Sequence, residues 1–168
     1  MNTSFLDRLN SEPHALAFAG QSTPWPVALA DQSANPALDE ALHTHAAAAQ
    51  ALLYPVSAEL LATTGRPVDL FGFEPNPARL GAAAAASASV PGIALTQLGA
   101  LLDAAALGYN PAQAKPVAVL GHSQGVLAVH MVQAICEAGS IDAAAAKIDE
   151  ILAIATLIGV AGTRQARQ

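Results

Sequence analysis

Two short apolar runs, each followed by a characteristic loop or helical pattern, organise this chain. The first run, at 15–19, leads into a polar, glycine-bearing loop at 20–24, which predicts a strand that ends in a loop. The second run, at 116–120, precedes apolar positions at helical spacing from 124 to 138. Strands that alternate with helices along a chain favour a layered architecture. The fold class predicted from this pattern is therefore α/β.

The sequence between the two runs predicts helices that are divided by prolines. An alanine- and leucine-rich pattern between residues 27 and 61 is broken by Pro36 and Pro55 into two or three helices. Apolar positions at helical spacing predict a further helix from Pro91 to Leu107, ended by Gly108. These helices are expected to supply most of the packing surface.

Three other segments complete the predicted organisation. Residues 66–79 have the composition of a loop with aromatic anchors at Phe71 and Phe73. The stretch 82–89 is nearly all Ala and Ser, which leaves both linker and helix open. A last helix is expected at 141–160, after a glycine-containing turn.

Composition narrows the class of protein. A length of 168 residues with 53% hydrophobic and 12% charged residues is enough for one domain with a continuous core. The net charge of −6, with no run of Lys or Arg, argues against nucleic acid and an anionic membrane as partners. The single cysteine, Cys136, excludes an internal disulfide and is interpreted as a small buried hydrophobe. Residues 1–12 show no secretory signal, so a cytoplasmic location is the expectation.

The pentapeptide Gly-His-Ser-Gln-Gly at 121–125 lies between the second strand and its helix. This context is typical of a nucleophile elbow, in which a serine on a sharp strand-to-helix turn projects its hydroxyl above the sheet. Glycines two residues before and after the serine are required because side chains do not fit in such a bend. Ser123 is therefore the candidate nucleophile, and the alternative is a structural turn in an inactive α/β domain.

Three segments carry a resemblance to a known family. They are Phe-Ala-Gly-Gln at 18–21, Ser-Val-Pro-Gly-Ile at 89–93 leading to Gln97, and the pentapeptide at 121–125. In this order they resemble the acyltransferase domain of bacterial and fungal type I fatty acid synthases over nearly the whole chain. The resemblance implies that residues 1–168 are a partial acyltransferase domain. Its implied fold is a helix-rich, three-layer α/β-hydrolase-like core, truncated before a ferredoxin-like subdomain.

The chemistry that this resemblance implies is two-step acyl transfer in fatty acid synthesis. Ser123 would take an acyl group from acyl-CoA and pass it to the phosphopantetheine thiol of an acyl carrier protein. Backbone N–H groups of Gln124 and of Gln21, in an oxyanion loop at 18–24, would stabilise the negative oxygen of the intermediate. His122 would line the entrance to the site. No metal and no resident cofactor are expected.

Two positions depart from the family's pattern. A malonyl-transferring relative carries an arginine on the helix after the elbow, next to a glycine, to pair with the carboxylate of its substrate. The resembling position is Ile158, which favours an acetyl starter unit and lines the substrate site. The family's catalytic histidine lies far downstream of the serine, whereas His130 follows Ser123 by 130 − 123 = 7 residues, about 10 Å along a helix. We therefore expect this sequence to be the N-terminal portion of a larger, homo-oligomeric synthase, with that synthase and the carrier protein as its partners.

Two other functions stay open at this point. The Gly-x-Ser-x-Gly pattern also serves serine esterases and thioesterases, which need an acid and then a histidine after the serine. A non-catalytic segment of a synthase would form no acyl adduct. His43 and His45, two residues apart on a predicted helix, are interpreted as solvated side chains and not as metal ligands.

Overall fold

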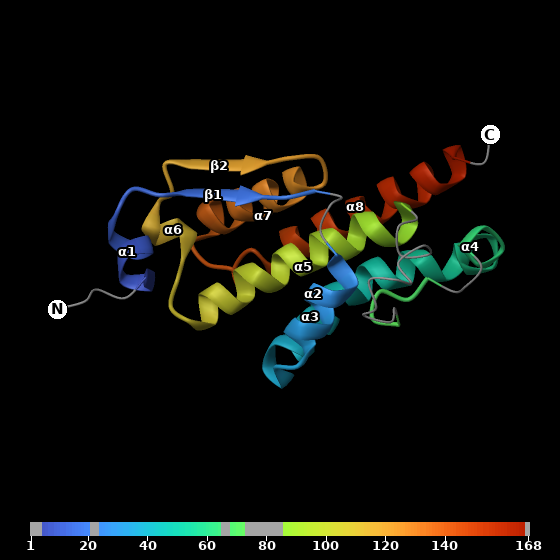
Figure 1. Ribbon diagram of the computed structural model, residues 1–168, viewed down its shortest axis with the longest axis horizontal. Helices are drawn as coiled ribbons and strands as arrows, with labels where there is room; N and C mark the ends of the chain where they lie inside the picture. Colours follow the sequence, from blue (N-terminus) through green and yellow to red (C-terminus); the bar gives the residue numbers. More distant parts are fainter. Residues whose placement is uncertain (1–4, 21–23, 65–67, 73–85, 167–168) are drawn as a thin grey trace.

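A computed structural model of the chain describes residues 5–20, 24–64, 68–72 and 86–166. It is a helix-rich α/β fold with one small parallel sheet (Figure 1). The elements are α1 Phe5–Ser11, β1 Ala15–Phe18, α2 Trp25–Ser33, α3 Pro36–Leu53, the 3-10 turn η1 Tyr54–Val56, α4 Ser57–Thr64, α5 Ala86–Ala106, α6 Pro111–Ala114, β2 Ala118–Gly121, α7 Gly125–Ala138 and α8 Ala145–Gln165.

The sheet consists of β1 and β2, which pair in parallel with Phe18 opposite Gly121. Both strands were predicted, although β2 begins two residues later than expected. Leu16, Phe18 and Val119 point inward and pack against the core. Helix α7 packs on both strands from that side. The residues between them on each strand face the other way, and Leu120 there is 60% exposed.

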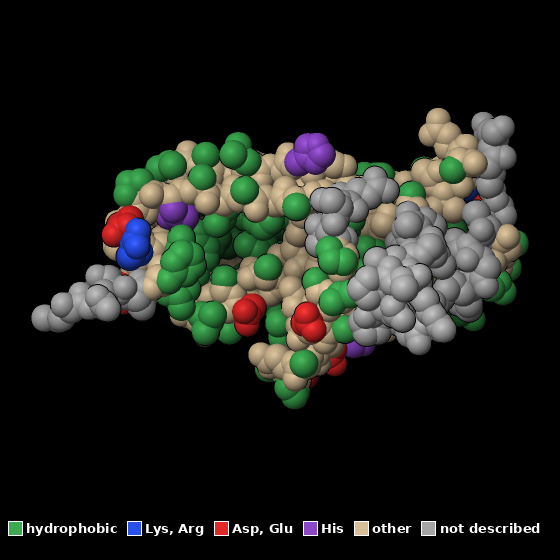
Figure 2. Space-filling view, viewed as in Figure 1, with side chains coloured by type: hydrophobic (Ala, Val, Ile, Leu, Met, Phe, Trp, Pro, Cys, Tyr) green, Lys and Arg blue, Asp and Glu red, His purple; other side chains and the backbone are tan. Residues whose placement is uncertain are grey.

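The outer face of this sheet is apolar and open in the described part of the chain. Figure 2 shows hydrophobic side chains along the upper edge of the molecule, above β2. Parallel sheets are usually covered on both faces, because their crossover helices pack on each side. The described residues therefore form two layers, a sheet and helices on one face, where a three-layer core was expected.

Helix α5 is the centre of the hydrophobic core and runs through the middle of the molecule (Figure 1). It packs most extensively on α8 and also contacts α2, α3 and α7. It is long and apolar enough to cross a membrane by composition alone, but 72% of the relevant window is buried inside this fold. Burial against four neighbouring helices is enough to explain its apolar composition.

The start of α5 differs from the prediction. The helix begins at Ala86, so Pro91 lies inside it and does not start it. A Cβ added at Gly159 of α8 would overlap the carbonyl oxygen of Ala86, so the two helices touch backbone to backbone there. The Ser87 N–H donates to the hydroxyl of Thr163 over 2.8 Å, which supplies an acceptor for a free donor at the helix start. Contact with α8 therefore extends α5 ahead of its proline.

The remaining boundaries follow local capping. Pro36 begins α3 behind Asn35, whose side chain accepts a hydrogen bond from the Ala37 N–H. The last helix begins at Ala145, four residues later than expected, because residues 140–144 form a turn. Within 82–89, the described residues 86–89 are helical. Phe73 and most of the predicted loop at 66–79 lie outside the described residues.

Candidate active site

The turn that carries Ser123 is a tight strand-to-helix connection. β2 ends at Gly121 and α7 begins at Gly125, with three residues between them. Ser123 has φ 55°, a left-handed backbone conformation that residues with a Cβ rarely adopt. Its side chain is exposed. The backbone of the turn thus matches what a nucleophile elbow requires: a strained residue that presents its hydroxyl outward.

Both glycines of the pentapeptide are needed for space. A Cβ added at Gly121 would lie 2.5 Å from the carbonyl oxygen of Gly125. A Cβ added at Gly125 would overlap the carbonyl oxygen of Phe18 on the neighbouring strand. The prediction that steric crowding fixes these two glycines is confirmed by the contacts.

The loop that follows β1 passes directly against the elbow. A Cβ added at Gly20 would lie 2.6 Å from the carbonyl oxygen of His122 and 2.7 Å from the Cβ of Ser123. The His122 N–H also donates to the Phe18 carbonyl over 3.1 Å, which continues the pairing of the two strands into the turn. The carboxyl ends of parallel strands meet at one edge of a sheet, and this brings the two predicted motifs together.

Two contacts with α5 fix the described residues on either side of 21–23. The side-chain amide of Gln97, on α5, donates to the carbonyl of Ala19. Trp25, which begins α2, is 3% exposed and lies against Gly92, where a Cβ would come within 2.5 Å of the indole. Gln97 and Gly92 belong to the segments that carry the family resemblance, and they contact Ala19 and Trp25 respectively.

Of the two proposed oxyanion donors, only the N–H of Gln124 belongs to the described residues. Gln124 occupies the N-cap position of α7, where backbone N–H groups lack partners within the helix, and its side chain makes no capping hydrogen bond. Its N–H has no acceptor among the described residues, so it is available to a ligand oxygen. Helix N-termini favour negative charge, which adds to this effect. Gln21 lies outside the described residues.

The hydroxyl of Ser123 is bonded to an amide and not to a base. Its Oγ donates to the side-chain Oε1 of Gln124 over 2.7 Å. Within the described part of the chain, no histidine hydrogen-bonds to it. His122 is exposed next to it, and His130 lies two turns further along α7 in a groove between α7 and α8. An amide oxygen accepts a hydrogen bond but is too weak a base to remove the proton.

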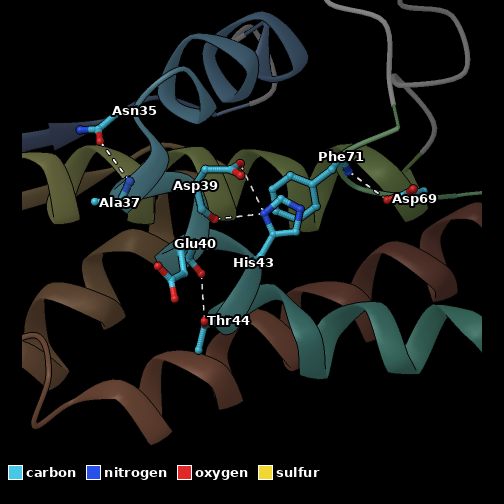
Figure 3. Close-up of polar contacts among 8 residues, drawn as sticks. All are labelled: Asn35, Ala37, Asp39, Glu40, His43, Thr44, Asp69 and Phe71. Atoms are coloured by element: carbon cyan, nitrogen blue, oxygen red, sulfur yellow. Dashed lines mark hydrogen bonds and ion pairs between the residues drawn. The ribbon is translucent and has the colours of Figure 1, made fainter.

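Histidines with defined partners lie elsewhere in the molecule. Figure 3 shows His43 on α3 between Asp39 and the ring of Phe71. Its Nδ1 donates to the Asp39 carbonyl over 3.0 Å and lies 3.4 Å from the Asp39 carboxylate. The two rings stack with centroids 3.6 Å apart. These groups line a hollow of about 420 Å³ between α2, α3 and residues 68–72, and the buried hydroxyl of Ser33 also lines it.

His45 is not the solvated side chain that the sequence suggested. Its side chain is 13% exposed, and its Nδ1 lies 2.6 Å from the Asp149 carboxylate of α8. The pair joins two helices that are 104 residues apart in sequence. Charge-assisted hydrogen bonds of this length stabilise helix contacts. No signal in the sequence linked the two residues, because the register between α3 and α8 is set by tertiary packing.

Cys136 also differs from its prediction, since it lies at the surface and is only partly covered by its neighbours. Partial burial raises the pKa of its thiol, and the neighbouring Glu137 carboxylate raises that pKa further. A thiol with a raised pKa holds little thiolate at neutral pH. Cys136 is therefore a poor nucleophile.

Ile158 lies on the exposed side of α8, at the end of the groove nearest the elbow. It is 51% exposed and lines the groove together with Val126, which follows Ser123 by one helical turn. The resembling position therefore carries an apolar side chain that lines the same groove as Val126.

Comparisons of this chain with protein-family models, with curated proteins and with solved structures found no match.

Proposed function

We propose that this protein carries the nucleophile half of an acyl-transfer site, in which Ser123 takes an acyl group from acyl-CoA and passes it to the phosphopantetheine of an acyl carrier protein. The observation that carries the proposal is the positive φ of Ser123 in a glycine-bounded turn, with the Gly20 loop in contact with it. Serine in this geometry presents its hydroxyl to a ligand and places it beside backbone donors. The family resemblance, to acyltransferase domains of type I fatty acid synthases, supplies the donor and the acceptor.

The proposed roles follow from the positions of the residues. Ser123 forms the acyl ester, the Gln124 N–H stabilises the oxyanion together with a donor from the 18–24 loop, and His122 lines the entrance. We also propose that the two layers correspond to part of a three-layer, α/β-hydrolase-like core. The described residues place no base at Ser123 that could accept the serine proton.

The acyl group of the proposed substrate is uncharged. No described cation lies beside Ile158 in the groove that it lines near the elbow, since Lys147 lies at the opposite end. A free carboxylate such as that of malonyl needs a cationic partner when it is desolvated, usually an arginine. Acetyl is therefore preferred to malonyl.

Intact-mass analysis after incubation with acetyl-CoA or malonyl-CoA tests this function. The proposal expects an acetyl adduct that maps to Ser123, is lost in Ser123→Ala, and forms faster than a malonyl adduct. A Ser123→Ala variant with unchanged circular dichroism is the matched control. An adduct that forms and then hydrolyses without an acceptor would indicate an esterase or thioesterase instead.

The amide partner of Ser123 favours one rival candidate, a non-catalytic segment of a synthase. A hydroxyl that is bonded to Gln124 and to no described base is not activated. This candidate predicts that no donor forms an adduct, even when an external base is supplied. That result, with the fold intact, would replace the proposal.

A further inference from the structure

A second feature near the elbow is a groove between α7 and α8. Its volume is about 500 Å³, within the usual range of ligand pockets. Along α8 it is lined by Ile151, Ile154 and Ile158, at helical spacing on one face. Ile154 and Ile158 are 44% and 51% exposed, so the groove floor is apolar surface in contact with solvent.

The two ends of the groove differ in charge. The helices are joined by the short turn at 139–144, so Glu137 of α7 and Lys147 of α8 lie together at that end. Glu137 also accepts a hydrogen bond from Gln133 over 2.8 Å, and Lys147 pairs with Glu150 over 2.7 Å. Charged groups therefore frame the far end of the apolar stretch.

The other end of the groove lies one residue beyond the elbow, at Val126, whose N–H donates to the Ser123 carbonyl over 3.1 Å. Val126 lines it there, three residues after Ser123, and is 44% exposed. The distance along α7 from Val126 to Glu137 spans 137 − 126 = 11 residues, about 16 Å at the helical rise. Apolar lining thus runs without a charged residue on α8 from the elbow to Lys147, and on α7 only the polar tips of His130 and Gln133 interrupt it.

We infer that this groove holds the acyl chain of the substrate, and that the preferred donors carry a saturated chain of medium length. The inference rests on the proposed function of Ser123. In the step concerned, the Ser123 oxygen bonds to the thioester carbonyl carbon and the carbon–sulfur bond breaks. The serine proton passes to the departing sulfur, so coenzyme A leaves as its thiol and the chain is left as an ester on Ser123.

The commitment to an acyl chain follows from three features of the groove. One end of the groove is at Val126, which is hydrogen-bonded to the Ser123 backbone. Its lining is mainly aliphatic, and Glu137 and Lys147 at its far end are charged groups that an aliphatic chain cannot solvate. Each methylene taken from water into such a surface improves binding by about fourfold at most. Preference should therefore rise with chain length up to the charged end and fall beyond it.

Two substitutions on α8 distinguish an effect on the groove from an effect on the neighbouring helix surface. Ile154→Trp places a large ring in the middle of the groove. Leu157→Trp adds the same ring at a position that is 56% exposed and does not line the groove. The second variant is therefore the matched control for the first.

The experiment has one arm that does not depend on catalysis. Dodecanoate is titrated into Ser123→Ala protein with carbon-13-labelled isoleucine methyl groups, and methyl shifts are followed by NMR. We expect saturable shifts at Ile151, Ile154 and Ile158, lost in the Ser123→Ala, Ile154→Trp protein and kept in the Ser123→Ala, Leu157→Trp protein. Shifts that are absent, or that do not saturate, would overturn the inference whatever Ser123 does.

The second arm compares adduct formation from acetyl-CoA, octanoyl-CoA, dodecanoyl-CoA and palmitoyl-CoA by intact mass. We expect octanoyl or dodecanoyl adducts to form at least tenfold faster than acetyl, with Ile154→Trp abolishing this difference and Leu157→Trp keeping it. Equal rates for all acyl chains would be compatible with the proposed function but would overturn the inference that the groove holds the acyl chain. Adducts from no donor, with dodecanoate bound in the first arm, would overturn the proposed function alone. A dimer in sedimentation that Ile154→Trp dissociates would assign the groove to a second copy and overturn the acyl-chain inference.

Discussion

The candidate nucleophile, Ser123, and the two histidines of α3 occupy two regions with opposite character. At the elbow, Ser123 has the backbone geometry of a nucleophile, but its hydroxyl is bonded to an amide. On α3, His43 and His45 each have a carboxylate partner, but no hydrogen bond links either ring to a serine in the described residues. Among the described residues, the first region has the candidate reactive atom without a bonded base, and the second has imidazoles that are paired with carboxylates and bonded to no serine.

This difference shows which parts of a catalytic site are local. A strand, a three-residue turn and a helix are enough to place one serine in a strained, outward-facing conformation and to leave an N–H free at the helix start. A general base must be brought from another element to within hydrogen-bonding distance. The first requirement is met here within residues 118–138, whereas the second needs tertiary contacts that the described residues do not provide at Ser123.

The largest expected effect is at the elbow glycine that touches β1. Gly125→Ala should lower the free energy of unfolding by about 3 kcal/mol, because its Cβ overlaps the Phe18 carbonyl, which is backbone and not the end of a flexible side chain. Urea denaturation followed by circular dichroism measures it. Gly139→Ala is the control, since Gly139 has φ 90° but no neighbour within 4 Å, and should cost about 1 kcal/mol from backbone strain alone. Equal costs for the two would contradict a crowded elbow.

The next largest expected effect concerns the ion pair between His45 and Asp149. His45 and Asp149 should show a coupling of about 1 kcal/mol in a double-mutant cycle of His45→Ala and Asp149→Asn, because the partly buried pair joins α3 to α8. Thermal or urea unfolding of the four proteins gives the value. The matching cycle for the more exposed His43 and Asp39, which are 3.4 Å apart, should give less. Coupling that is larger in the exposed pair would refute this ranking.

A smaller effect directly tests the backbone strain at Ser123, the candidate nucleophile. Ser123→Gly should raise the free energy of unfolding by about 0.5–1 kcal/mol, since glycine accepts the left-handed conformation but loses more backbone entropy on folding. Ser123→Ala keeps the Cβ and should leave stability nearly unchanged. A Ser123→Gly protein that is no more stable than the Ser123→Ala protein would show that the backbone at Ser123 is not strained.

The smallest effect concerns the other nucleophilic side chain, Cys136. Its thiol pKa is raised in the folded protein, by burial first and then by Glu137, so the thiolate forms at higher pH than in an unfolded chain. Alkylation by iodoacetamide near pH 8 should therefore be slower in the folded protein than in urea, and Glu137→Gln should speed the folded reaction. A folded thiol that reacts faster than the unfolded one would show the opposite shift.

The sequence predicted most of what is local in this fold. The two strands, the prolines that begin or break helices, and the crowded glycines of the elbow all follow from short-range sterics, and each is present. It did not predict that α5 begins ahead of Pro91, because that depends on the close approach of Gly159 from α8. The burial of His45 and the exposure of Cys136 were missed for the same reason: both depend on how helices pack and not on any motif.

The measurement that tests the central claim most directly is chemical rescue of Ser123 by an external base. Acetyl-CoA is incubated with the protein at increasing imidazole concentration, and the modified peptide is identified by mass spectrometry. The account predicts that imidazole accelerates acetylation of Ser123, in proportion to its concentration, and has no such effect on the Ser123→Ala protein. An unmodified Ser123 at every imidazole concentration, in a folded protein, would contradict the claim that this elbow is a nucleophile site that lacks only its base.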